Sequence, residues 1–296
     1  MTKPQPTVET LITDPARWGL IKSKATAARA CLVFTLFREK GIEPILIKGL
    51  AAARSYPEGQ FRDSVDMDIA VAALDFDIAK HVVESNAAKG LAIDLHRELR
   101  HLDTVDWTNL VANSALIDFD SGTIRVLSPE DHLRVLCVHW LTDGGANKDR
   151  LWDIYYAVTN REPDFDWDRF LNVVDQKRRR WLICTLGLAQ RYLDLDLTGT
   201  PIEREVMDIP AWLINAVEKE WSSDTPLWPL FSSIHDRKLF IAQIKKRLPP
   251  NPVTATVLVN GSFDAKTRFF YQIGTIFVRI GPSIVNITKN LFTRAK

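Results

Sequence analysis

Residues 45–71 read ILIKGLAAARSYPEGQFRDSVDMDIAV and join two apolar, strand-like runs through a short polar connection. The first run, Ile45–Lys48, is typical of a buried strand. Gly49 breaks it, and an Ala-rich sequence predicts a short helix directly afterwards. A turn then leads to Arg62 and to a second strand expected over residues 65–71. This strand–helix–strand unit is the element around which we expect the chain to be organised.

The second expected strand carries two acidic residues, Asp66 and Asp68. Side chains two positions apart in a strand point to the same face, so these carboxylates should project together. Met67, Ile69 and Val71 should then face the core. Two adjacent carboxylates repel each other unless they are protonated or bridged by a cation. The pair therefore predicts a site for a divalent metal ion.

The sequence on either side predicts a small mixed sheet with helices packed against it. Asp14-Pro15 is a good helix start, and an apolar stripe continues to about Lys40. A helix over 74–88 and a strand over Ala92–Leu95 follow the acidic strand. Further elements are expected as a helix from Asp106, a hairpin around Ser121-Gly122, and helices near 129–141, 148–159, 166–177, 180–193, 209–220 and 233–247.

The composition changes at Ser128, after which helices dominate. Ser128-Pro129 followed by Glu130 and Asp131 has a capping serine, a proline in the first turn and acids that favour the helix dipole. We therefore expect an α+β protein with two domains, 1–127 and 128–296.

Charge and cysteine content narrow the class of protein. Lys+Arg 38 against Asp+Glu 37 gives a net charge of +1, so there is no global electrostatic basis for binding nucleic acid. Cys31, Cys137 and Cys184 lie singly in apolar segments, as buried thiols of a reducing compartment do. The N-terminus lacks the apolar core of a secretory signal, so a cytoplasmic protein is expected.

Three further features lie where they could complete a phosphate-binding site. Asp94 on the third expected strand could join the acidic pair around one or two Mg²⁺ ions, which prefer oxygen ligands. Lys48-Gly49 lies at a strand-to-helix junction, where backbone N–H groups can approach a phosphate. Arg62 could bind a phosphate with its planar guanidinium. Singly, each feature is more often structural; their order along the chain is what indicates a site.

That order resembles the nucleotidyltransferase superfamily with the DNA polymerase β-like fold. Within it, the chain is similar to a poorly characterised bacterial family found near polysaccharide or peptide-natural-product genes. The matching motifs are Ile47-Lys48-Gly49, Arg62 to Asp68, Asp94-Leu95-His96, Leu127 to Asp131, Leu136 to His139, Leu151 to Ile154 and Asp166-Trp167, so the resemblance covers roughly residues 15–200. Leu50 stands where the superfamily commonly has Ser, and Asp94 stands where the family more usually has Glu.

The resemblance implies a catalytic domain over 1–127 and a helical substrate or lid domain over 128–296. It implies Asp66, Asp68 and Asp94 as catalytic residues and ligands of Mg²⁺, with Mn²⁺ as the alternative ion. Lys48, Gly49, Arg62 and His96 would bind the nucleotide. His96 could instead be purely structural.

The implied reaction is transfer of a nucleoside monophosphate, with AMP from ATP favoured, to an unidentified acceptor on a small molecule, peptide or glycan precursor. One alternative is a toxin-like enzyme acting on RNA or a tRNA end. Another is a catalytically degenerate protein that binds a nucleotide or a partner.

The sequence allows more than one binding partner for each of two basic segments. Lys177 to Arg180 is a dense basic run, interpreted as a solvated helix end or, less favoured, a contact for nucleic acid or anionic lipid. The final apolar-basic segment, from Phe269 to Arg294, could dock on the helical domain or lie on a membrane surface.

Overall fold

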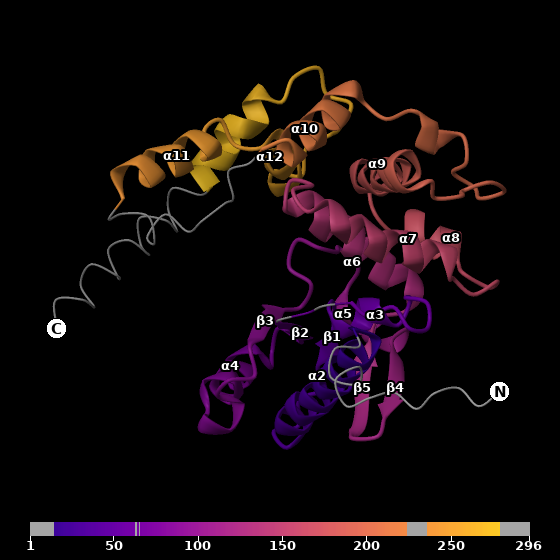
Figure 1. Cartoon of the computed structure of the whole chain (residues 1–296), viewed down its shortest axis with the longest axis vertical. Coiled ribbons are helices and arrows are strands. Elements are labelled where there is room, and N and C mark those ends of the chain that lie inside the picture. The colour runs from indigo at the N-terminus through magenta and orange to yellow at the C-terminus, as the bar shows by residue number, and fades with distance from the viewer. Residues whose placement is uncertain (1–14, 63, 65, 224–235, 279–296) are drawn as a thin grey trace, which may run out of the picture. The chain divides into compact units, whose positions relative to one another are not determined.

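The protein was examined as a computed structural model, which describes residues 15–62, 64, 66–223 and 236–278 (Figure 1). The chain forms two compact units. Unit 1 combines residues 1–136 with 152–173, and unit 2 combines 137–151 with 174–296. This division differs from the boundary expected near residue 127, because helical residues 129–136 and 152–173 pack in unit 1. Because the chain leaves unit 1 and later returns to it, no single change of composition along the sequence marks the boundary between the two units.

Unit 1 contains the five-stranded sheet and the helices around it. Its elements are α2 (Pro15–Arg38), β1 (Ile45–Leu46), α3 (Leu50–Ala53), β2 (Met67–Val71), α4 (Phe76–Glu84), η1 (Asn86–Ala88), β3 (Ile93–Arg97), α5 (Trp107–Ala112), β4 (Ala115–Phe119), β5 (Gly122–Val126), α7 (Leu151–Thr159) and α8 (Trp167–Leu171). Helix α6 (Pro129–Thr142) begins in unit 1, and its residues from Cys137 onward belong to unit 2.

The sheet is mixed, with the strand order β3-β2-β1-β5-β4. β2 pairs antiparallel with β1 and parallel with β3, and β5 pairs parallel with β1 and antiparallel with β4. The predicted hairpin at Ser121-Gly122 is the β4–β5 connection. The predicted α+β class is confirmed.

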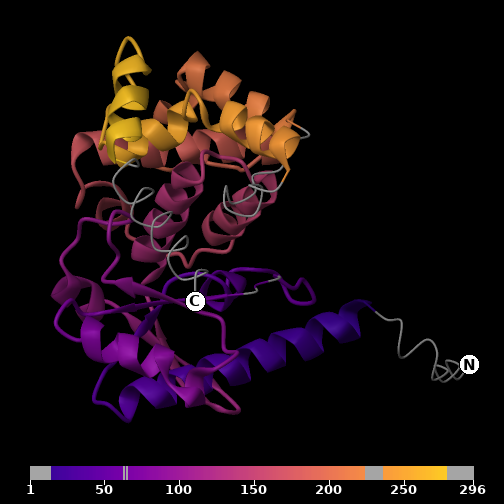
Figure 2. The same cartoon turned by 90° about the vertical axis from the view of Figure 1, so that its left-hand side faces the viewer.

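Apolar residues of α2, α4 and the strands form the core of unit 1. Phe34 and Phe37 of α2, Ile69 of β2 and Ala79 of α4 are completely buried in one cluster. Figure 2 shows α2 along its length. Each fully buried aromatic or aliphatic side chain contributes about 1.5–3 kcal/mol to folding. This core fixes β2 and β3, the strands that carry the acidic residues.

Unit 2 is helical in its described part. It contains η2 (Lys148–Arg150), α9 (Gln176–Leu193), η3 (Glu205–Met207), α10 (Ala211–Trp221), α11 (Arg237–Arg247), α12 (Pro252–Leu258) and a helix over 269–278. Three tryptophans donate their indole N–H groups to backbone carbonyls: Trp181 donates to Gly261, Trp212 to Phe263 and Trp221 to Gly145. Such tryptophans tie distant segments of the unit together.

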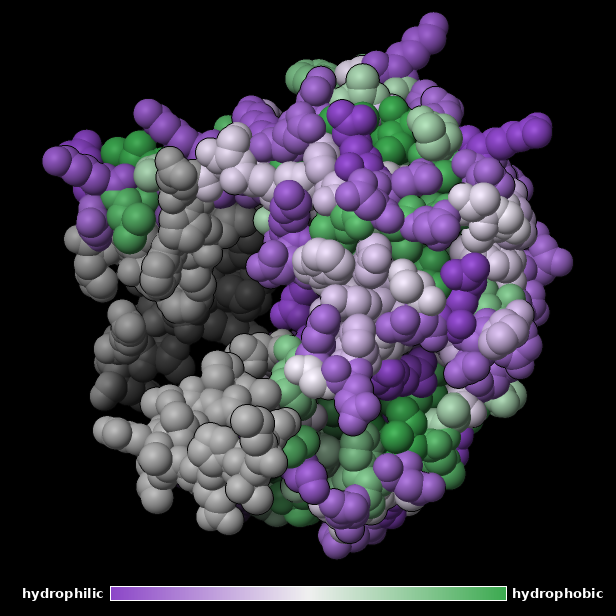
Figure 3. Space-filling model, turned by 45° about the vertical axis from the view of Figure 1, so that its right-hand side comes forward, coloured by the Kyte–Doolittle hydropathy of each residue, from purple (hydrophilic) through white to green (hydrophobic). Residues whose placement is uncertain are grey.

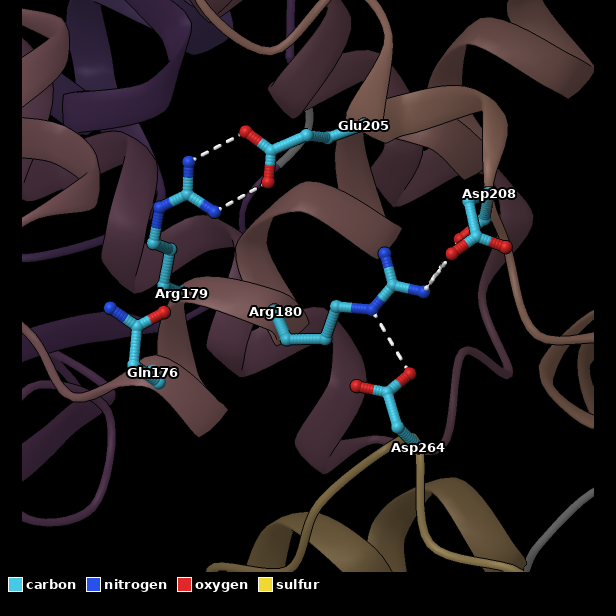
Figure 4. A pocket seen from close by; sticks show the side chains of 6 residues that line it. All are labelled: Gln176, Arg179, Arg180, Glu205, Asp208 and Asp264. Carbon is cyan, nitrogen blue, oxygen red and sulfur yellow. Dashed lines mark hydrogen bonds and ion pairs between the residues drawn. The ribbon is translucent and has the colours of Figure 1, made fainter.

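The basic run 177–180 lies in the first turns of α9, so the break expected there between two helices is wrong. Asp175 caps this helix, because its side chain accepts a hydrogen bond from the backbone N–H of Arg178. Arg179 forms a bidentate pair with Glu205, and Arg180 pairs with Asp208 and Asp264 (Figure 4). These carboxylates offset the positive charge locally, so the run gives no support to a nucleic-acid contact.

No helix in the described ranges is long and apolar enough to cross a membrane. The face drawn in Figure 3 mixes hydrophilic and hydrophobic residues. The C-terminal segment with the expected membrane-surface contact extends into residues 279–296, which lie outside the described residues.

Candidate functional site

Three polar side chains of β2 and β3 converge at one point of the sheet. The parallel pairing places Asp68 opposite Asp94 and Ala70 opposite His96. His96 lies two residues beyond Asp94 and therefore shares its strand face. Its Nε2 atom lies 3.2 Å from Oδ1 of Asp68 and 3.2 Å from Oδ2 of Asp94. The ligand atoms of all three residues lie within 4.8 Å of one another.

The carboxylate of Asp68 is buried and paired with two nitrogen atoms. Nζ of Lys48 lies 2.5 Å from Oδ1, the same oxygen that His96 approaches. Burial alone would raise the pKa of Asp68, but the hydrogen bond with His96 and the charge of Lys48 outweigh it and hold the pKa at about 2. Asp68 is therefore ionised throughout the physiological range, as a metal ligand must be.

Gly49 links β1 to α3 in a conformation that favours glycine. Its φ angle is +64°, and a Cβ atom there would lie 2.7 Å from the hydroxyl of Ser64. The expected cradle of helix N–H groups is small, because α3 has only four residues. Leu50 provides no hydroxyl where the superfamily commonly has Ser. A nearby hydroxyl comes from Ser64, which donates a hydrogen bond to the carbonyl of Asp66. The sequence motif did not indicate the Ser64 hydroxyl.

Asp66 lies one residue before β2, at a bend, and its side chain is exposed. Its carboxylate is outside the group formed by Asp68, Asp94 and His96. The strand expected over 65–71 starts two residues later, at Met67, so Asp66 does not follow the alternation that would place it beside Asp68.

Arg62 is held by a carboxylate rather than standing free for a phosphate. Its Nε and Nη2 donate to the two carboxylate oxygens of Asp153 at 2.6 and 2.8 Å, and the Tyr56 hydroxyl donates to the same carboxylate at 2.8 Å. The Arg62 and Asp153 side chains are 7% and 5% exposed. Burial opposes the charge of Arg62, yet Asp153 raises its pKa above the usual value. Among the described residues, Nη1 is buried without a hydrogen-bond partner.

The donor set fits a divalent metal ion. Two carboxylate oxygens and one imidazole nitrogen suit Mn²⁺ readily, while Mg²⁺ favours oxygen ligands more strongly. The Asp94 side chain is 53% exposed, which leaves one side of the group accessible. Nδ1 of His96 is buried and has no partner within the described ranges.

A comparison with family models finds one similar family. Residues 77–194 match the model of a family described as an uncharacterised nucleotidyltransferase. This segment is similar to that family, which supports the resemblance to the nucleotidyltransferase superfamily. The resemblance read from the sequence is thus confirmed. Searches of curated proteins and of solved structures gave no match.

The matched segment contains part of the candidate site. Asp94 and His96 lie inside residues 77–194, and Asp153 does as well. Lys48 and Asp68 precede the match and are joined to it by the β2–β3 pairing. Their place in the site therefore rests on geometry.

Sequence reasoning missed the role of Asp153. It lies in the Leu151 to Ile154 motif that contributed to the resemblance, yet nothing in its neighbours indicates a partner 91 residues away. The local sequence shows only that Asp153 is an acidic residue in the first turn of an otherwise apolar helix, α7.

Proposed function

We propose that the protein is a metal-dependent nucleotidyltransferase that moves AMP from ATP onto a hydroxyl, amine or phosphate acceptor and releases pyrophosphate. The acceptor would belong to a small molecule, peptide or glycan precursor. The convergence of Asp68, Asp94 and His96 carries this proposal. The nucleotidyltransferase match over 77–194 supports the reaction class.

Asp68, Asp94 and His96 would hold the metal ion, Mg²⁺ or Mn²⁺, and Asp66 would enter the ligand set if its exposed side chain turned toward them. When bound, the ion would supply positive charge to the phosphate oxygens of the nucleotide. We propose that Lys48 adds a second positive charge at this point, since its ammonium group already lies against Asp68.

Asp94 is the carboxylate best placed to receive a proton. Its side chain is half exposed, whereas Asp68 is buried and occupied by Lys48. An acceptor hydroxyl would give its proton to Asp94 as its oxygen attacks the α-phosphorus. The bond to the bridging α–β oxygen then breaks, and pyrophosphate leaves with the bonding electrons. His96 would orient Asp94 through the 3.2 Å contact.

Label transfer from α-labelled nucleoside triphosphates tests this function. The purified protein is incubated with Mg²⁺ or Mn²⁺ and with small-molecule and RNA fractions of host cells, and label and pyrophosphate are followed. We expect transfer that EDTA abolishes and that Asp68→Asn and Asp94→Asn reduce at least a hundredfold. Asp77→Asn, which alters an exposed carboxylate of α4, should transfer at the wild-type rate.

Three results would contradict the proposal. Transfer that survives Asp68→Asn would remove the metal assignment. Transfer only to the RNA fraction would favour the RNA-directed alternative. Absence of both nucleotide binding and labelling with every fraction would remove the enzyme itself.

A further inference from the structure

The helix over residues 269–278 turns an apolar side to solvent. Phe270, Ile273 and Phe277 lie at positions i, i+3 and i+7, so they share one side of the helix. They are 71%, 36% and 73% exposed, and the adjacent Phe269 is 59% exposed. These four residues are called the apolar face below. Single exposed apolar residues are ordinary, whereas a group of large ones on one helix is typical of a binding surface.

The opposite side of this helix attaches it to unit 2. Thr275 is completely buried, and its hydroxyl donates a hydrogen bond to the carbonyl of Ala255 in α12 at 3.3 Å. The side-chain amide of Gln272 donates to the carbonyl of Pro250 at 2.7 Å. A helix on the surface of a soluble domain usually buries its apolar side and exposes its polar side. Here polar side chains make the attachment, and the phenylalanines remain outside it.

Charge is distributed unevenly along the chain. Residues 237–296 contain eleven Lys and Arg residues and one acidic residue, Asp264, whereas residues 1–236 contain 27 Lys and Arg against 36 Asp and Glu. Asp264 is itself paired with Arg180, at 3.1 Å. The near-neutral total therefore combines an acidic larger part with a strongly basic C-terminal part. Such asymmetry indicates an anionic partner for the basic part.

Exposed basic residues lie close to the apolar face along the chain. Helix α11 carries five basic residues and no acidic one, and Lys245 in its last turn is exposed. Lys266 is exposed three residues before the helix that bears the apolar face. The contact of Gln272 with Pro250 joins that helix to the chain three residues beyond the end of α11. The apolar face and the basic residues thus belong to neighbouring segments of unit 2.

An anionic membrane surface suits both features at once. Duplex nucleic acid offers phosphate charge but no apolar phase for three phenylalanines and Ile273, and an apolar protein groove offers the reverse. At the interface of a bilayer, apolar side chains enter the headgroup region while Lys and Arg pair with lipid phosphates. Apolar insertion and electrostatic attraction together give stable attachment where either alone is weak.

We propose that the apolar face and the basic residues of 237–296 dock the protein on a membrane surface that contains anionic lipid. The phenylalanines insert at the level of the headgroups, and the lysines and arginines face the lipid phosphates. This docking goes beyond the proposed reaction and does not depend on it.

Cosedimentation with lipid vesicles tests the docking. The purified protein is mixed with vesicles of phosphatidylcholine alone or of phosphatidylcholine with phosphatidylserine. We expect at least tenfold tighter binding to the vesicles that contain phosphatidylserine. Raising NaCl from about 0.1 M to about 0.5 M should reduce this preference, because salt screens the attraction between the basic residues and the lipid.

A pair of double variants tests the apolar face. Phe270→Ser with Phe277→Ser should weaken binding to phosphatidylserine vesicles at least tenfold, since two inserting rings are removed. The control is Leu74→Ser with Met207→Ser, which replaces two side chains that are 95% and 73% exposed outside the apolar face. The control should bind as the wild type does.

A second pair tests the charges. Lys245→Gln with Lys266→Gln should weaken binding at least tenfold, because each cation near the surface is attracted by anionic lipid. Lys80→Gln with Lys89→Gln removes two exposed cations of unit 1 and should have no effect. All four double variants should keep the melting temperature of the wild type, because every replaced side chain is exposed.

The proposal is overturned if the protein shows no preference for phosphatidylserine vesicles, or if the test variants bind as their controls do. Binding of a single-stranded RNA through Lys245 and Lys266, without vesicle binding, would instead assign the basic part to nucleic acid. A dimer in sedimentation velocity that Phe270→Ser with Phe277→Ser dissociates, without vesicle binding, would assign the apolar face to a second copy of the chain. Label transfer is measured without lipid, so failure of the docking and failure of the proposed function are read separately.

Discussion

Lys48 and His96 approach the same oxygen atom, Oδ1 of Asp68, at 2.5 and 3.2 Å. A metal ion bound through Oδ1 of Asp68 would share that oxygen with the ammonium group or take it from the ammonium group. Lys48 therefore compensates a buried carboxylate. In the proposed function, Lys48 would lie next to both the metal ion and the nucleotide phosphates.

Replacement of Lys48 by Met should strengthen metal binding. Removing the ammonium group removes both a competitor for Oδ1 and a repulsive charge, so we expect the affinity for Mn²⁺ to rise about tenfold, equivalent to roughly 1.4 kcal/mol. Paramagnetic resonance of free Mn²⁺ measures this directly. Lys80→Met, at an exposed position of α4, is the matched control. Unchanged or weaker Mn²⁺ binding in Lys48→Met would contradict the competition.

The ion pair of Arg62 and Asp153 should be important for the stability of unit 1. Removing one partner of a buried pair leaves the other charge uncompensated, so Arg62→Ala should lower the free energy of unfolding by about 3–5 kcal/mol. Replacing both partners, as in Arg62→Met with Asp153→Leu, should recover much of that loss. Urea unfolding at pH 7 measures both effects.

An exposed ion pair should contribute much less to the free energy of unfolding than the buried pair of Arg62 and Asp153. Lys80 and Glu84 lie 3.8 Å apart on α4 with both side chains 61% exposed. Lys80→Ala should change the free energy of unfolding by less than about 1 kcal/mol. Equal losses for Lys80→Ala and Arg62→Ala would show that burial does not set the value of the Arg62 pair.

The sequence predicts the local framework of the candidate site well. The apolar pattern identifies the acidic strand and the strand of Asp94 and His96, which pair in the structure, and Gly49 marks the turn after β1. These features depend on residues close together in the chain. Apolar alternation and a glycine directly after a strand can be recognised in the sequence without knowledge of the tertiary packing.

Long-range pairing is what the sequence could not provide. Arg62 meets Asp153 from 91 positions away, and Ser64 meets Gly49 across the connection that precedes β2. The exposed position of Asp66 depends on where β2 starts, which differs by two residues from the expected strand. A shift of that size is within the ordinary uncertainty of strand ends. It nevertheless leaves Asp66 outside the group formed by Asp68, Asp94 and His96.

The three cysteines should be unreactive in the folded protein. Cys31, Cys137 and Cys184 are free thiols and at most 3% exposed, and burial raises the pKa of each, that of Cys184 to about 12. Since the thiolate is the reactive form, Ellman's reagent should label the native protein slowly and three thiols rapidly in guanidinium chloride. A thiol that reacts in seconds under native conditions would contradict their burial.

His132 of α6 should make stability depend on pH below neutrality. Its side chain is buried, so burial, together with the charges of Arg54 and Arg62, holds its pKa well below 6.5 despite a hydrogen bond with the backbone of Ile47. Between the two pKa values the unfolded chain binds a proton at this position and the folded chain does not. The stability is therefore complete above about pH 6.5 and falls as the pH drops below it.

The variant His132→Gln removes this proton while keeping an amide that can bond to the backbone. Between pH 6 and pH 5 the wild type should lose up to about 1.4 kcal/mol more than His132→Gln, the value for one proton over one pH unit. Urea unfolding at pH 7, 6 and 5 measures the difference. His81→Gln, at an exposed position of α4, should keep more of the wild-type pH dependence. Parallel curves for the wild type and His132→Gln would mean that His132 is protonated in the folded protein, which its burial beside two arginines opposes.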